Sequence, residues 1–289
     1  MNPVVLSVGP RYRDLLGFRI NRAWPTARRR LIGPFVFFDH MLCCELPPGR
    51  GLDVPPHPHI GLATLTCLFE GELMHRDSMA ITQIIRPGEL NWMIAGRGVT
   101  HSERSSDSAR AQQSRLHGTQ IWVALPREIE QCEPAFRHVT ADELPERQMG
   151  LCRVRLLAGN AFGMRAPVPF DVSLHYADVH NDPGALLELA PDLGQRAVYV
   201  LAGGLRCAGQ FYEPGQLLVF ADDVTVHLEA PVAAHWILLG GPKLAEDREV
   251  WWNFVATSPE TIDAARRRWA DEQFPAVPDE SGAMKMPEY

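Results

Sequence analysis

The chain has 289 residues, of which 46% are hydrophobic and 22% are charged, which is ordinary for a globular protein and excludes a disordered or collagen-like chain. The 28 basic residues against 35 acidic ones give a formal charge of −7, which disfavours direct nucleic-acid binding through a basic face. This length suggests two domains, each large enough to bury its own core.

No apolar run reaches the ~18 residues that a membrane-spanning helix needs, and the first residues lack the charged and long apolar regions of a signal peptide. We therefore expect no membrane partner. The six cysteines form no CxxC pair and no dense framework, which is typical of reduced thiols. The expected location is cytoplasmic.

Short apolar runs separated by turn residues dominate the first half of the chain. They predict strands over residues 64–69, 72–75, 81–85, 90–94, 99–103 and 118–125. Closely spaced strands with few helical stretches are typical of a β-sandwich or β-barrel. We therefore predict an all-β fold.

The second half repeats two of the turns of the first half. Glu70–Leu73 matches Ala202–Leu205, and Pro87–Leu90 matches Pro214–Leu217 in the same order. Two ordered matches indicate a duplicated β-domain. We place the two domains at residues 1–137 and 138–289.

Near the C-terminus the pattern becomes helical. Ser258 and Pro259 have the residue types of an N-cap and a first helical turn, and apolar residues then recur at helical intervals. The pattern predicts one helix that ends before Pro275. Residues 276–289 are expected to form a loosely held tail.

Two pairs of residues stand out as candidate metal ligands. His57-Pro58-His59 and His101-Ser102-Glu103 each space two potential ligands at positions i and i+2, which share one face of an extended strand. Two such strands facing inward would bring three imidazoles and one carboxylate around a point. This donor set suits a divalent ion such as Fe(II), Mn(II), Ni(II), Co(II), Cu(II) or Zn(II).

Other histidines have weaker signals. His40 is expected either near the site or bonded within the core, and His75 at an exposed edge. His227-Leu228-Glu229 repeats the HxE spacing, but the segment near Leu189 lacks the matching histidines. We therefore expect a second barrel without metal. No spacing signal marks His117, His138, His175, His180 or His235.

The first half of the chain resembles the pirin family, a branch of the cupin superfamily. The resemblance is carried by Gly33–Phe35, Phe38–Met41, His57–Thr64, Phe69–Glu72, His75–Ser78 and Pro87–Glu103, and more loosely by Val250–Val255. It implies two jelly-roll barrels packed together, with a C-terminal helix. It also implies one metal ion, usually iron, in the N-terminal barrel, with His57, His59, His101 and Glu103 as its ligands.

The resemblance also implies a reaction. Some pirins cleave the flavonol quercetin with O₂ at the metal, releasing carbon monoxide, and Glu103 is the best-placed base for the flavonol hydroxyl. The expected partners are then a small aromatic substrate and O₂. The alternative is a non-catalytic, metal-binding regulatory protein that acts through protein partners. The native metal, the physiological substrate and the oligomeric state stay open, although pirin relatives are often monomers.

Overall fold

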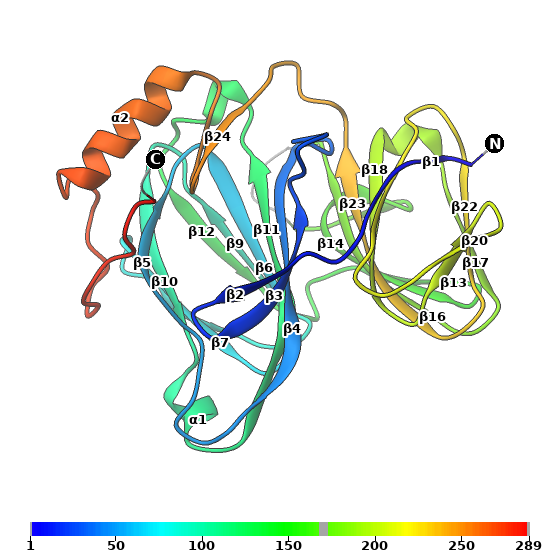
Figure 1. Cartoon of the computed structure of the whole chain (residues 1–289), viewed down its shortest axis with the longest axis horizontal. Coiled ribbons are helices and arrows are strands. Elements are labelled where there is room, and N and C mark those ends of the chain that lie inside the picture. Colours follow the sequence, from blue (N-terminus) through cyan, green and yellow to red (C-terminus); the bar gives the residue numbers. More distant parts are fainter. Residues whose placement is uncertain (1, 168–172, 288–289) are drawn as a thin grey trace. The chain divides into compact units, whose positions relative to one another are not determined.

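The computed structural model describes residues 2–167 and 173–287 (Figure 1). Most of its regular structure is β-strand, as predicted. Its helices are α1 (Asp107–Arg110) and α2 (Pro259–Ala270), with short 3-10 turns at Arg127–Ile129 and Pro191–Leu193. Among the described residues, no helix has both the length and the apolar character needed to span a membrane.

The chain forms two compact units. The N-terminal barrel comprises Tyr12–Ile20, Phe38–Ala141 and Ala245–Tyr289, and the C-terminal barrel comprises Met1–Arg11, Asn21–Phe37 and Asp142–Leu244. These units differ from a single division after residue 137. The C-terminal residues join the N-terminal barrel because α2 buries its apolar side in a cluster that includes Ile60.

Two sheets build the N-terminal barrel. In spatial order, the seven-stranded sheet contains β12 (Ala135–Val139), β9 (Leu90–Ile94), β6 (Leu62–Glu70), β11 (Ser114–Ala124), β4 (Phe35–Leu46), β3 (Phe18–Trp24) and β2 (Tyr12–Leu15). The four-stranded sheet contains β5 (Asp53–His59), β10 (Val99–Arg104), β7 (Leu73–Asp77) and β8 (Thr82–Ile85). A separate hairpin joins β24 (Glu249–Trp251) to β25 (Phe254–Ala256).

The C-terminal barrel repeats this plan. Its larger sheet contains β1 (Val4–Val8), β21 (Leu217–Phe220), β18 (Gln195–Ala202), β23 (Ala234–Gly241), β16 (His175–Asn181), β14 (Cys152–Ala161) and β13 (Glu146–Met149), with β15 (Met164–Arg165) paired to β14. Its four-stranded sheet contains β17 (Ala185–Leu189), β22 (Val226–Ala230), β19 (Leu205–Cys207) and β20 (Gln210–Tyr212).

The repeated turns occupy equivalent places in the two barrels. Gly71 joins β6 to β7 and Gly203 joins β18 to β19, both at positive φ (+84° and +73°). A Cβ at Gly71 would lie 1.9 Å from the Arg115 carbonyl oxygen, and one at Gly203 would lie 2.1 Å from that of Ala233. Only glycine fits both turns, which explains why the repeat is visible in the sequence.

The inner faces of the two four-stranded sheets differ in chemistry. In the C-terminal barrel, β22 buries Val226, Leu228 and Ala230 in an apolar core. In the N-terminal barrel, β7 alternates in the same way but buries His75 and Asp77. Burying a polar side chain costs free energy unless it forms a hydrogen bond or an ion pair. The polar inner face of the N-terminal barrel is therefore the candidate functional site.

The predicted helix is confirmed as α2. Its N-cap is Ser258, whose hydroxyl oxygen accepts a hydrogen bond of 3.3 Å from the Thr261 amide, and Pro259 occupies the first turn as expected. The helix ends at Ala270, before Pro275. None of the six cysteines, which all lie within the described residues, is part of a disulfide.

Candidate metal centre

Strands β5 and β10 form the ribbon that carries the candidate ligands. They pair antiparallel, with His57 opposite His101 and His59 opposite Val99. Because alternate residues of a strand face the same side, the three histidines share the inner face of this ribbon. All three are buried.

The three imidazole rings converge on one point. His57, His59 and His101 each offer a ring nitrogen, and these atoms lie within 4.8 Å of one another. His59 Nε2 lies 3.1 Å from His101 Nε2. The ring centroids of His57 and His101 are 4.3 Å apart. Sequence spacing therefore selected three side chains that the fold brings together.

Backbone carbonyls fix two of these rings. His57 Nδ1 lies 2.9 Å from the Pro55 carbonyl oxygen, and His59 Nδ1 lies 3.2 Å from that of Asn253. A carbonyl only accepts, so each Nδ1 carries the hydrogen and donates it. In a neutral ring the Nε2 atom is then left with a lone pair that faces the centre.

His101 is fixed by two further side chains, His75 and Asp77. Asp77 Oδ2 accepts a hydrogen bond of 2.9 Å from His75 Nε2. His75 Nδ1 is therefore free to accept from His101 Nδ1, which lies 3.4 Å away. The chain of bonds leaves the His101 Nε2 lone pair pointing at the same centre as those of His57 and His59.

Electrostatics at the centre favour neutral rings. Burial lowers the pKa of His57 to about 4. Burial, reinforced by the neighbouring histidines, also holds the pKa of His59 and of His101 well below its ordinary value. Neutral imidazoles are the form that binds metal. Two lone pairs 3.1 Å apart repel one another unless a cation lies between them, so the donor set fits a metal ion.

Glu103 follows on the same face of β10, opposite His75 of β7. Its carboxylate does not join the three nitrogens within 4.8 Å; instead it accepts a hydrogen bond of 3.5 Å from Thr66 Oγ1. Burial raises the pKa of the Glu103 carboxyl, and nearby His75 and Thr66 offset this only in part. The Glu103 carboxyl therefore lies beside the three histidines and has a raised pKa.

The walls around the histidines combine aromatic rings and amides. The Trp122 ring meets the edge of His59, with centroids 5.1 Å apart. Phe136 stacks on His75 at 4.6 Å, and Thr66 Oγ1 lies 2.7 Å from Gln120 Oε1. Two aromatic rings thus pack directly against His59 and His75.

The expectation of an exposed edge position for His75 is wrong. Its side chain is buried, since β10 covers one edge of β7 and β8 the other. The spacing His75-Arg76-Asp77 is also i, i+2, and this was the signal available in the sequence. Without the pairing of β7 with β10, nothing in the sequence linked it to His101.

The remaining histidines do not belong to this group of converging ring nitrogens. His40 bonds within the barrel, with its Nε2 2.9 Å from His117 Nε2, which matches the second of its two expected readings. His138 Nδ1 lies 2.8 Å from Asn91 Oδ1. In the C-terminal barrel, His227 points outward toward Glu188 at 3.8 Å and is 75% exposed.

Residues 280–284, which follow α2 and are called the C-terminal segment below, cover the outer face of the ribbon formed by β5 and β10. Glu280 is 4% exposed and accepts hydrogen bonds from Arg104 (2.6–2.9 Å), Ser102 (3.0 Å) and Arg76 (3.2 Å). The Met284 amide donates to the Pro56 carbonyl at 2.8 Å. The expectation of a loosely held tail is wrong for residues 280–284, because the buried Glu280 carboxylate is paired with Arg104 and the Met284 amide bonds to β5. Residues 288–289 of that predicted tail lie outside the described residues.

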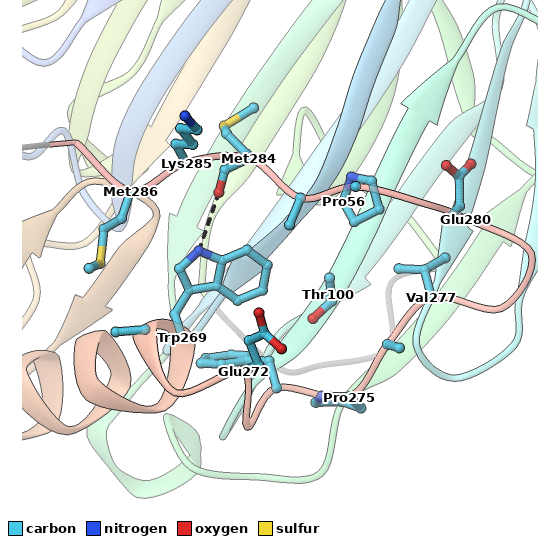
Figure 2. Close-up of a pocket in the computed structure, with 15 residues that line it drawn as sticks. Pro56, Thr100, Trp269, Glu272, Pro275, Val277, Glu280, Met284, Lys285 and Met286 are labelled. Carbon is cyan, nitrogen blue, oxygen red and sulfur yellow. Dashed lines mark hydrogen bonds between the residues drawn. The ribbon is translucent and has the colours of Figure 1, made fainter.

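This segment closes a cavity of about 490 Å³ (Figure 2). Trp269 donates from its Nε1 to the Met284 carbonyl at 3.3 Å, the bond dashed in Figure 2. Pro56 and Thr100 form the part of the lining that belongs to β5 and β10. They directly precede His57 and His101 but lie on the opposite face, so this cavity is separate from the metal centre.

Comparisons with known proteins agree with this architecture. Residues 17–123 match the Pirin family, and residues 176–275 match the Pirin C-terminal cupin domain. A pirin-like protein of Caulobacter vibrioides is 40% identical over 281 residues, which cover 96% of this chain and 93% of the relative. Pirin of Homo sapiens is 31% identical over 271 residues, covering 91% and 90%.

A solved structure shares the fold of this chain. The crystal structure of quercetin 2,3-dioxygenase from Acinetobacter baumannii is 29% identical and matches with a TM-score of 0.91, covering 99% of this chain and 95% of that chain. The predicted fold, two cupin domains with one C-terminal helix, is confirmed. On these grounds the chain belongs to the pirin family of cupin proteins.

Proposed function

We propose that the chain is a metal-dependent dioxygenase that cleaves a flavonol such as quercetin with O₂. The observation that carries this proposal is the convergence of three buried ring nitrogens, from His57, His59 and His101, at one centre. The likeness to the quercetin 2,3-dioxygenase of Acinetobacter baumannii supports the substrate class.

The proposed ligands are His57, His59, His101 and Glu103, holding one divalent ion. Three imidazoles and a carboxylate suit Fe(II), our first choice, and also Mn, Ni, Co, Cu or Zn. When bound, the ion supplies a Lewis acid for the flavonol hydroxyl and redox chemistry toward O₂. Carbonyls at Pro55 and Asn253 keep two of the rings in the ligating tautomer.

Glu103 is the proposed general base. Its raised pKa brings the basicity of the carboxylate closer to that of the flavonol 3-hydroxyl, which favours transfer of the hydroxyl proton. Trp122 and Phe136 supply aromatic walls for the substrate rings. The overall reaction balances as flavonol plus O₂ giving the depside and carbon monoxide: the two oxygen atoms enter the product as the ring opens.

The test is a matrix of metals and flavonols with O₂ uptake and carbon monoxide release as readouts. We expect about one ion per N-terminal barrel and flavonol consumption with at least one of Fe, Mn, Ni, Co or Cu. His57→Ala and Glu103→Ala should lose that ion, whereas His227→Ala, an exposed histidine, should keep it. Retention of the ion by both ligand variants would reject the assigned ligands.

The proposed setting is the cytoplasm, consistent with six cysteines that form no disulfide, with no direct nucleic-acid or membrane partner. A non-catalytic regulatory role through a protein partner is the competing proposal. The same matrix separates the two. If the N-terminal barrel binds its ion but no flavonol is consumed with any metal, the regulatory role takes precedence.

A further inference from the structure

A second cluster of potential ligands lies in the C-terminal barrel, on β16 and β23. Asp178 and His180 are two residues apart on β16 and so share one face. His235 of β23 lies directly opposite His180 in the antiparallel pairing. Directly opposed residues on neighbouring strands have side chains close enough to act together.

The three side chains meet at one point. Asp178 Oδ1 lies 2.5 Å from His235 Nε2, and Asp178 Oδ2 lies 3.5 Å from His180 Nε2. The two imidazoles stack with centroids 3.9 Å apart and planes 16° from parallel. One donor atom from each residue lies within 4.8 Å of the others.

The charges around the cluster leave the carboxylate ionised. Burial alone would raise the pKa of Asp178, but the hydrogen bonds from His180 and His235 lower it well below its ordinary value. On the adjacent strand β14, Arg153 faces His180 and Arg155 faces Asp178. Both arginines are paired with Glu146, at 3.3 and 2.9 Å, so their charge is partly neutralised.

The cluster is also accessible. A cleft of about 520 Å³ is lined by His180 and His235, together with Gln148, Arg153 and Asp182. The Asp178 and His235 side chains are 13% and 14% exposed, and that of His180 is 40% exposed. An ion can therefore reach the donors, and coordination positions would remain open toward the cleft.

We infer that Asp178, His180 and His235 bind a second divalent transition-metal ion. Two imidazoles and one carboxylate favour Zn(II), Co(II), Ni(II) or Cu(II) over Mg(II) or Ca(II), which prefer all-oxygen ligands. This inference departs from the expectation of a second barrel without metal. The proposed ligands are not His227 and Glu229, the pair that repeats the HxE spacing in the second half. The inference does not depend on whether the N-terminal barrel is an enzyme.

The experiment is equilibrium dialysis of the full chain against Co(II) or Zn(II), with metal analysis and protein concentration giving the stoichiometry. We expect two ions per wild-type chain, and one for the His180→Gln and His235→Gln variants. The matched control is His227→Gln, an exposed histidine of the same barrel, which should keep two ions. Circular dichroism and a thermal melt verify that each variant is folded.

A second arm removes the N-terminal ion. The double variant His57→Ala, His101→Ala should retain one ion per chain, and adding His180→Gln should remove it. Co(II) absorption in the visible range reports nitrogen ligation directly and should disappear with that third change. An unchanged stoichiometry in His180→Gln and His235→Gln, or equal losses in the His227→Gln control, would each overturn the inference.

Discussion

His75 Nδ1 accepts the hydrogen that orients His101, at an Nδ1 to Nδ1 distance of 3.4 Å, while its other nitrogen donates to Asp77. The geometry of the candidate metal centre thus depends on a residue that is not one of the three converging histidines. Outer partners of this kind fix the tautomer and direction of a ligating imidazole.

We therefore expect His75→Phe to weaken metal binding by roughly 10–100-fold without removing any ligand. The phenylalanine ring at position 75 can still stack on Phe136. It has no nitrogen that could accept the hydrogen bond from His101. Competition with a chelator of known affinity measures the change. His138→Phe is the matched control, because His138 bonds to Asn91 and is not one of the converging histidines. Equal affinities in wild type and His75→Phe would contradict the role given to His75.

Asp77 is a poorer place to test the same bond. Its Oδ1 also accepts from the amides of Met79 and Ile81, which hold the turn after β7. A substitution of Asp77 would alter both the turn and the candidate metal centre, so a loss of metal would have two explanations. A substitution of His75 leaves these turn hydrogen bonds of Asp77 in place and so tests the contact with His101 alone.

Glu103→Gln tests the proposed base. The amide has the shape of the carboxylate but cannot accept the substrate proton, so flavonol turnover should fall by about 10²–10⁴-fold. Turnover is compared at equal metal content, determined for each preparation. Thr66→Val removes the hydroxyl that contacts both Glu103 (3.5 Å) and Gln120 (2.7 Å) but keeps the Glu103 carboxylate. It serves as the control and should have a much smaller effect. Full turnover in Glu103→Gln would exclude Glu103 as the base.

Glu280→Gln should release the C-terminal segment. Hydrogen bonding to Arg104 lowers the pKa of Glu280, so the anchor is present at neutral pH and is lost as the pH falls through that lowered pKa. Losing a charge-assisted bond costs about 2 kcal/mol. Hydrogen exchange at residues 280–284 should therefore accelerate roughly 30-fold. Glu272→Gln, in the same cavity, should leave exchange unchanged; a slow segment in Glu280→Gln would refute the anchor.

We expect the buried His175 to lower the free energy of unfolding at acidic pH. Burial, together with nearby Arg196, lowers its pKa from 6.5 to about 3, and its Nε2 has no hydrogen-bond partner within the described part of the chain. Because the unfolded chain takes up the proton first, stability is complete above pH 6.5 and falls as the pH approaches 3.

At pH 5 this one group lowers the free energy of unfolding by about 2 kcal/mol relative to pH 8. Thermal melts of wild type and His175→Gln at the two pH values measure the difference. The variant should lose less stability between pH 8 and pH 5 than wild type, whatever its absolute melting temperature. Parallel pH profiles for the two proteins would show that His175 does not titrate in this way.

Local spacing made part of the site predictable from the sequence. His57, His59 and His101 were found because i, i+2 pairs on a strand must share a face. The same rule applies to His75 with Asp77 and to Asp178 with His180. What could not be predicted was which strands are neighbours: His101 meets His75 through β10 and β7, and His180 meets His235 through β16 and β23.

The fold was predictable to a similar extent. Turn residues and apolar runs placed most strands of the N-terminal barrel, since glycine at positive φ is a local requirement. The anchoring of Glu280 by Arg104 was not predictable, because it joins residues 176 positions apart. The composition of residues 276–289 alone resembles that of a free tail.

The carbonyl of Asn253 that orients His59 lies 194 positions further along the chain. A ribosome therefore produces His57, His59 and His101 long before it produces the group that aligns one of them. The order of synthesis therefore separates the candidate ligands from part of their support. The His59 imidazole acquires its hydrogen-bond acceptor only after Asn253, which follows the second barrel in the sequence, has been added to the chain.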